Sequence, residues 1–453
     1  MQSQTPPSDL EAKAGCPVHG QAAEQPAFHV IDARPGFALL GRRPEAIYGS
    51  VLSRSTGCKP YMDGNKAGVH LTLGQPVMLS RDSERAAIQM TDELFAICND
   101  GYEERLRNLV ARGLLVDNGY WFQRLSQGAV QRNLGFISVW SGLLVKPAAG
   151  LWLLMTGSYN RRAGVNLRDT VFADDQGYTP LMLEFEAASM SKDTMWLESE
   201  LACLVPIRPG VEWRRETIAG RRDLGDAYNE FYGGSYLETR GAGKAVGRYR
   251  KLVAGERPVA NPGVARCSLV TIAGPDVHTI ETFTNIAGSH GPMPEETGAR
   301  LPYVMLRNFT PLEFDFDGLQ SHLNNDDANT HGDELLEVWG DLFGKENAAH
   351  IDWWTSYFTG NVPMHYGEPN ALIIPYAFVE TPPGWSTLAD GVHYPGLDSL
   401  RGIVATDVFY HAGPVLQFQR HGDFRLEAGD PLLRLLPVPP PLLGAPYELV
   451  DLE

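Results

Sequence analysis

An internal repeat constrains the possible fold of this chain more than any other feature of its sequence. The segment from Ser141 to Ile207 returns, with its landmarks in the same order, between Tyr376 and Val438. The matched positions keep a nearly constant separation: Val145 and Val379, Gly150 and Gly384, Leu154 and Leu388, Gly157 and Gly391, Leu167 and Leu400, Val171 and Val404, Asp174 and Asp407, Leu183 and Leu416, Phe185 and Phe418. This ordered series predicts that one structural module occurs twice.

Each copy has the pattern of short strands separated by turn residues. The Ala-Ala-Gly and Pro-Pro-Gly sequences that end at Gly150 and Gly384 favour tight turns, because glycine readily adopts a positive φ. Each copy then closes with a leucine-rich strand that contains Pro206 or Pro437. We therefore predict a mainly β (α+β) fold with two tandem β-sandwich or β-clip-like modules and helical insertions.

The length of 453 residues fits two or three domains. Apolar residues between Ser83 and Gly113 recur with a period close to that of an amphipathic helix. We expect a disordered N-terminal tail over 1–26, a first β-rich module over 27–214 with a helical insertion over 83–113, a connector over 215–261 and a second β-rich module over 262–453.

Several short motifs in the second copy resemble those of a domain from an uncharacterised family of bacterial proteins. They are Pro383-Gly384, Leu400-Arg401-Gly402-Ile403, Thr406-Asp407 and Gly429-Asp430-Pro431. The first copy keeps Gly157-Ser158-Tyr159-Asn160 and Asp174 but lacks the Gly-Asp-Pro turn. The resemblance implies two divergent copies of that domain, and it brings no known activity with it.

The second copy also resembles the β-clip of deoxyuridine triphosphatase-like proteins, on the strand at Gly402-Ile403 and the turn at Gly429-Asp430. Two parts of that pattern are missing from this sequence: the Arg- and Ser-rich phosphate motif, and the catalytic aspartate in its Gly-Ile-Ile-Asp-x-x-Tyr setting. The resemblance therefore implies kinship of fold, and nucleotide hydrolysis does not follow from it.

Composition narrows the environment and the partners. The net charge of -17 is unfavourable for binding nucleic acid or anionic membranes. No apolar run approaches the roughly 20 residues of a membrane-spanning helix, and the N-terminus lacks the features of a secretory signal. The five cysteines lie far apart without a C-x-x-C motif, which is typical of reduced thiols. We predict a cytoplasmic protein without a membrane or nucleic-acid partner.

Three H-x-D triplets suggest a metal site; they begin at His331, His350 and His421. Alternate residues of a strand point to the same side, so such a triplet can offer an imidazole and a carboxylate to one ion. His350 and Asp352, completed by His365 or His411, would form a facial triad for Fe(II) or another divalent metal. The alternative interpretation gives these residues surface or capping roles.

Aromatic residues gather next to this motif. Trp353, Trp354 and Tyr357, together with His393, could wall a pocket for a small-molecule ligand. The same rings could instead anchor a core, or fill the boundary between the two modules. The sequence pattern leaves both interpretations open.

Two hypotheses about function follow from these features. The first is a small-molecule enzyme of bacterial secondary metabolism, metal-dependent, with its site in the C-terminal module. The second is a non-enzymatic ligand-binding or assembly protein, in which the paired β modules form a pocket or the interface of a homo-oligomer. The sequence contains no P-loop, G-x-S-x-G, H-E-x-x-H or kinase motif, so the reaction class stays open.

Overall fold

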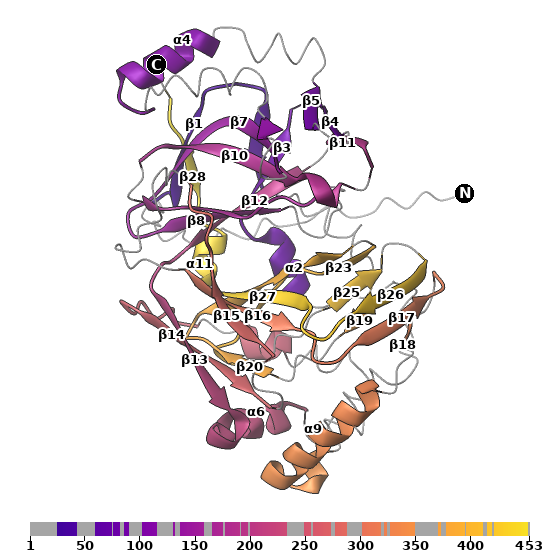
Figure 1. The fold of residues 1–453 in the computed structure, drawn as a ribbon. Coiled ribbons are helices and arrows are strands. Elements are labelled where there is room, and N and C mark those ends of the chain that lie inside the picture. The colour runs from indigo at the N-terminus through magenta and orange to yellow at the C-terminus, as the bar shows by residue number, and fades with distance from the viewer. Residues whose placement is uncertain are drawn as a thin grey trace, which may run out of the picture.

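The fold is mainly β, which confirms the predicted fold class. Figure 1 shows two β-rich modules stacked on one another, with helices α6 and α9 at the far end of the second module. The computed structural model describes residues 25–42, 59–74, 76–81, 86–89, 102–115, 130–131, 136–157, 165–174, 177–190, 192–197, 200–232, 249–254, 257–272, 277–287, 301–318, 321–323, 327–348, 370–372, 377–394, 396–410, 415–418 and 421–451. Residues 1–24 of the predicted tail lie outside these ranges.

The first module is built on a five-stranded antiparallel sheet. Its order is β2 (Ala38–Gly41), β3 (Val69–Leu73), β12 (Glu200–Ile207), β8 (Trp152–Gly157) and β9 (Thr170–Phe172). A second sheet has the order β10 (Thr179–Glu186), β7 (Phe136–Pro147), β1 (Phe28–Asp32) and β28 (Tyr447–Leu449), with β6 (Val130–Gln131) also on β7. The remaining elements are β11 (Thr194–Leu197), β4 (Val77–Arg81), β5 (Ala86–Gln89), α2 (Lys59–Lys66) and α4 (Tyr102–Ala111).

The second module has a main sheet of the same size and the same pattern of antiparallel pairing. Its order is β15 (Thr279–Thr282), β16 (Pro302–Arg307), β27 (Pro431–Val438), β21 (Ser386–Gly391) and β24 (Gly402–Val404). A second sheet joins β13 (Val211–Thr217), β14 (Ala265–Thr271) and β20 (Ala377–Glu380). The other elements are β17 (Leu312–Phe316), β18 (Ser321–Leu323), β26 (Gly422–Leu426), β19 (Asn370–Leu372), β22 (His393–Tyr394), β23 (Leu397–Ser399), β25 (Val415–Phe418), α6 (Arg222–Tyr232), α9 (Asp327–Phe343) and α11 (Pro440–Leu443).

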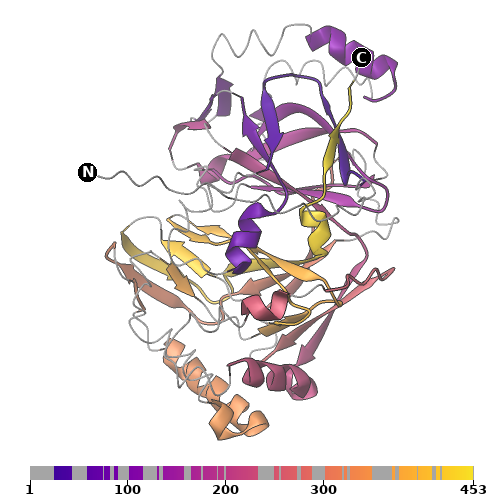
Figure 2. The same ribbon diagram turned by 180° about the vertical axis from the view of Figure 1, so that it is seen from behind.

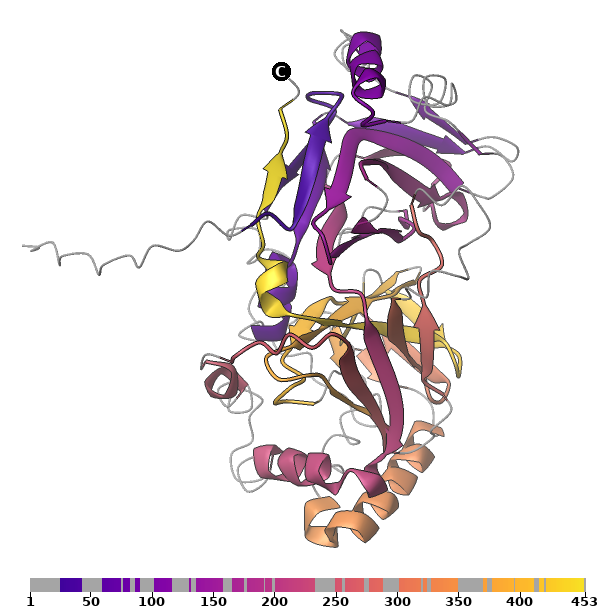
Figure 3. The same cartoon turned by 90° about the vertical axis from the view of Figure 1, so that its left-hand side faces the viewer.

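Each module gives one strand to the other. β13 follows the last strand of the first module, β12, and pairs in parallel with β14 of the second module. β28 follows β27 of the second module and pairs in parallel with β1 of the first (Figures 1 and 3). The boundaries proposed from the sequence follow chain order, whereas these two strands cross between the modules and tie them together.

Three of the six hydrophobic clusters among the described residues involve the main sheets. One lies inside the first module and one inside the second. The third, which we call the seam, joins the facing main sheets of both modules. The seam consists of Ala67, Trp152, Leu154, Val171, Ala173, Cys203, Val205, Ile207, Phe283, Leu301, Leu388, Ile403, Leu436, Val438 and Leu443. Burial of this apolar surface holds the modules in a fixed relation.

The predicted helical insertion over 83–113 is only partly helical. α4 covers its C-terminal part, but Ala86–Gln89 forms strand β5, which pairs with β4. Backbone groups of β5 form hydrogen bonds with the neighbouring strand, and this pairing overrides a local helical period. None of the helices in the described part of the chain combines the length and apolar character of a membrane-spanning segment.

Candidate functional site

Most of the residues predicted to form a site fall outside the described residues. These are His350, Asp352, His365 and His411 of the metal hypothesis, and Trp353, Trp354 and Tyr357 of the aromatic pocket. Both hypotheses stay predictions. His393 lies in β22, where its backbone is opposite Asp398 of β23. Within the described ranges, no group of three or more histidine, cysteine, aspartate or glutamate side chains is arranged to hold a metal ion.

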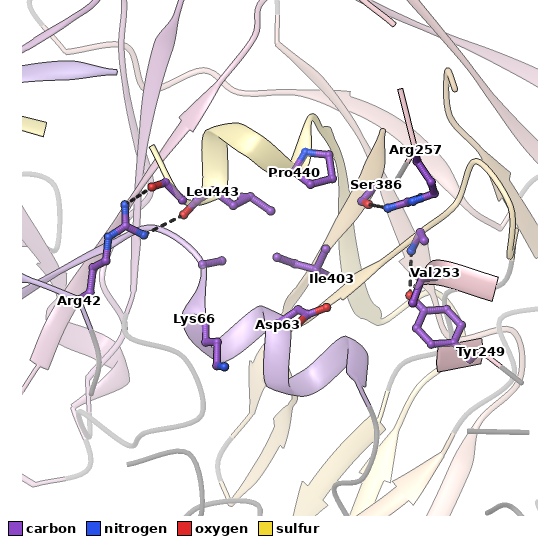
Figure 4. Close-up of a pocket in the computed structure, with 13 residues that line it drawn as sticks. Arg42, Asp63, Lys66, Tyr249, Val253, Arg257, Ser386, Ile403, Pro440 and Leu443 are labelled. Atoms are coloured by element: carbon purple, nitrogen blue, oxygen red, sulfur yellow. Dashed lines mark hydrogen bonds between the residues drawn. The ribbon is translucent and has the colours of Figure 1, made fainter. Parts of the chain in front are cut away.

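A cavity of about 330 Å³ opens at the seam, beside α2 and α11. Figure 2 shows these two helices next to each other between the modules, and Figure 4 shows the side chains around the cavity. We call it the seam cavity; its lining includes the charged residues Arg42, Asp63, Lys66 and Arg257 and the apolar or aromatic residues Tyr249, Ile403 and Leu443. Both modules therefore contribute to one site.

Neighbouring groups hold both arginines of the seam cavity, Arg42 and Arg257. The Arg42 guanidinium caps the end of α11 by donating to the carbonyl oxygens of Leu443 and Gly444, at 3.4 and 2.5 Å (Figure 4). It also donates to the carbonyl oxygen of Ala445, at 2.7 Å. Arg257 forms an ion pair with Asp407. Lys66, in the last turn of α2, is exposed. A chain with a net charge of -17 thus places three cations and one carboxylate around this cavity.

A buried cluster of polar side chains contacts Ala67, a residue that lines the seam cavity. Cys203 of β12 and His70 of β3 are directly opposite each other, with Sγ 4.0 Å from Nε2. The other imidazole nitrogen, Nδ1, lies 2.6 Å from Oε1 of Glu200. We call Cys203, His70 and Glu200, together with Arg401, the thiol cluster. All four side chains are buried.

A β-bulge explains why Glu200 can reach His70. In a regular strand, residues three positions apart point to opposite sides, so Glu200 and Cys203 would face different cores. The pairing of β12 with β3 shifts between Glu200 and Ala202, which inserts one extra residue and turns the Glu200 side chain to the Cys203 side. The carboxylate, the imidazole and the thiol therefore line up on one face of the sheet.

The charges around Cys203 favour its thiolate. Burial by itself would raise the pKa of the thiol, but the positive charges of His70 and Arg401 outweigh this and lower the pKa to about 7. Burial would likewise lower the pKa of His70, and the neighbouring Cys203 and Glu200 instead raise it to about 9. As a thiol, Cys203 donates a hydrogen bond to the carbonyl of Ala67, with a separation of 3.3 Å.

Cys267 shows what burial does without such neighbours. It is also a free, buried cysteine, located on β14. Burial raises the pKa of its thiol well above the usual range, and the negative charge of Glu380 raises it further. The character of Cys203 therefore comes from His70 and Arg401, and not from its position in a β core.

The thiol cluster could not be predicted from the sequence. His70 and Cys203 lie in separate strands, far apart along the chain, and no spacing rule links them. The one sequence signal that points to the cluster is the Leu-x-Gly-Ile motif, in which Arg401 occupies the variable position. Its side chain is fully buried, as is unusual for arginine.

Comparison of this chain with models of known protein families, with curated proteins and with solved structures finds no match. The seam cavity and the thiol cluster are therefore the features from which a function can be inferred.

Proposed function

We propose that this chain binds a small organic anion in the seam cavity, between its two β modules. The observation that carries this proposal is the gathering of Arg42, Lys66 and Arg257 around one cavity of a strongly acidic protein. Guanidinium and ammonium groups bind carboxylates and phosphates through charge-assisted hydrogen bonds. Because Arg42 and Arg257 are held by neighbouring groups, binding would cost little side-chain entropy at these positions.

The size and the wall of the cavity limit the ligand. A volume of about 330 Å³ lies at the lower end of the range for small-molecule sites. Tyr249, Ile403 and Leu443 offer apolar surface next to the cations. The Tyr249 hydroxyl accepts a hydrogen bond from the backbone N–H of Ala405, which fixes the ring at the cavity (Figure 4). These features favour a carboxylate or phosphate ester with a small apolar body.

Replacing Lys66 by glutamine should weaken binding of such an anion about tenfold, because one charge-assisted hydrogen bond contributes roughly 1.5 kcal/mol. Isothermal titration calorimetry with phenyl phosphate and with benzoate would measure this, and uncharged benzamide would test the need for charge. The matched control is Lys251→Gln, which removes the same charge from an exposed residue outside the cavity lining.

The expected result is saturable binding of at least one anion by the wild type and by Lys251→Gln, with a loss in Lys66→Gln. Two outcomes would contradict the proposal. One is the absence of binding by either anion to the folded wild-type protein. The other is an equal loss in both lysine variants, which would indicate a general effect of net charge.

We also propose that the two modules arose by duplication of one ancestral module. The backbone N–H of Gly150 donates to Oδ2 of Asp174 at 2.6 Å, and that of Gly384 donates to Oδ2 of Asp407 at 2.8 Å. The shared strand order of the main sheets and the reciprocal exchange of β13 and β28 support the same origin. The proposed ligand would then bind where the two copies meet.

A further inference from the structure

We propose that Cys203, His70 and Glu200 form a nucleophilic site at which the Cys203 thiolate accepts an acyl group from a small activated ester or thioester. This activity goes beyond anion binding and does not depend on it. The arrangement supplies a nucleophile, a proton-carrying imidazole and a carboxylate that orients the imidazole. The chain thus brings together the three roles of an acyl-transfer triad in one cluster.

The distances assign these roles. Nε2 of His70 faces the sulfur at 4.0 Å, and its Nδ1 lies 2.6 Å from the Glu200 carboxylate. The short contact with Glu200 fixes the ring orientation and stabilises its protonated form. The longer separation from sulfur must shorten for direct proton transfer, but it already allows His70 to stabilise a thiolate by charge. Glu200 is therefore a positioning residue, and Cys203 is the reacting group.

The second module carries an ionic pair at the matching place in its main sheet. Cys203 of β12 lies between His70 and Thr156 of the adjacent strands. In the second module, Arg434 of β27 lies between two residues in the same way, namely Met305 and Asp390.

The contacts across the seam are reciprocal. Asp169, just before β9, reaches from the first module to Arg434 of the second. Arg401, just before β24, reaches from the second module to Cys203 of the first. One contact joins a carboxylate to an arginine, and the other joins an arginine to the thiol. If Cys203 is a thiolate, its contact with Arg401 is ionic, as is the contact between Asp169 and Arg434. This parallel between the two modules supports a thiolate at Cys203.

The seam cavity is separated from the thiol by Ala67 and is the side from which a small reagent would approach it. Cys203 is fully buried, so a reagent cannot attack it from the outer surface. The Ala67 carbonyl lies 3.3 Å from the sulfur, and Ala67 also lines the seam cavity. No more than one small residue therefore separates the cavity from the thiol. The backbone of its neighbour Gly68 packs directly on the thiol: a Cβ there would lie 2.6 Å from the carbonyl oxygen of Leu204 and 2.8 Å from the sulfur.

The reaction is balanced as follows. The thiolate attacks the carbonyl carbon, a carbon–sulfur bond forms, and the bond from that carbon to the leaving oxygen or sulfur breaks. The leaving group departs with the electron pair and takes its proton from the His70 imidazolium. The positive charge of Arg401 beside the sulfur stabilises the negative charge as it moves to the carbonyl oxygen. The products are a thioester on Cys203 and a free alcohol or thiol.

The test uses p-nitrophenyl acetate on the full chain, without added anion. Released nitrophenolate gives the rate, and peptide mass spectrometry locates the acetyl group among the cysteines. We expect acetylation at Cys203 and none at Cys267, the buried control. The rate should rise with pH and reach half its maximum near pH 7, because the thiolate fraction of Cys203 follows its pKa of about 7. His70→Gln should slow the reaction at pH 7 at least tenfold and move the midpoint upward.

Glu200→Gln should move the midpoint in the same direction by less, since Glu200 acts through His70. Circular dichroism and thermal unfolding would show that each variant is folded. If His70→Gln does not fold, the wild-type midpoint and the comparison with Cys267 still decide. Acetylation of Cys203 no faster than of Cys267, or an unchanged midpoint in folded His70→Gln, would overturn the proposal. The reagent is uncharged, so an absence of anion binding by the wild-type protein would leave this result standing.

Discussion

Replacing Arg434 by methionine should lower the free energy of unfolding by about 3–5 kcal/mol, because it leaves a buried carboxylate without its counter-charge. Arg434 forms ion pairs with Asp390 of its own module and with Asp169 of the first module. The Asp390 side chain is 0% exposed, so water cannot replace the lost guanidinium. The cation also lies over the Phe283 ring, at 4.9 Å from its centre, and that contact would be lost as well.

Denaturation in guanidinium chloride, followed by tryptophan fluorescence, would measure this loss. Arg425→Met is the matched control: Arg425 pairs with Glu313 and Glu427 at the surface, and its removal should leave stability within error of the wild type. Adding Asp390→Asn to the Arg434→Met variant should recover part of the lost free energy of unfolding, since it removes the negative charge of the buried carboxylate. A loss below about 1 kcal/mol in Arg434→Met would contradict a buried ionic contact between the modules.

The local parts of this fold could be predicted from the sequence. Glycine after a small residue or proline predicts a turn with positive φ, and Gly150 and Gly384 have φ of 76° and 78°. The mainly β class follows from the same kind of local evidence, namely short apolar segments bounded by turn residues. The helix prediction over 83–113 was wrong at Ala86–Gln89, because these residues pair with β4. No local sequence pattern indicates that pairing partner.

The non-local parts could not be predicted. The three residues of β28, Tyr447–Leu449, show nothing that specifies β1 as a partner, since parallel pairing depends on how the modules meet. The thiol cluster depends on a bulge that turns Glu200 to the face of Cys203, and a strict period of two would place them on opposite sides. The predicted metal residues, including His350, lie outside the described residues, so that hypothesis stays a prediction.

Alanine substitutions at the matched glycines of the two turns, Gly150 and Gly384, should distinguish the cost of backbone strain from the cost of a steric clash. Gly150→Ala should destabilise by about 1–2 kcal/mol, the cost of an L-residue in the left-handed region, because a Cβ there meets nothing within 4 Å. A Cβ at Gly384 would lie 2.5 Å from the carbonyl oxygen of Pro258 and 2.6 Å from Cα of Val259. These are backbone atoms, so relief requires movement of the segment itself. Gly384→Ala should therefore cost about 1–3 kcal/mol more than Gly150→Ala.

The steric clash in Gly384→Ala should also affect binding in the seam cavity. The displaced segment follows Arg257, and Ala260 ties it to the turn by donating to the Pro383 carbonyl at 2.9 Å. Gly384→Ala should thus shift Arg257 and weaken binding of phenyl phosphate severalfold, whereas Gly150→Ala, in the other module's turn, should leave binding unchanged. Chemical denaturation and calorimetry on both variants would measure the two effects. Equal losses of stability, or equal binding, in the two variants would show that Pro258 yields to the added methyl group and that Arg257 does not depend on this turn.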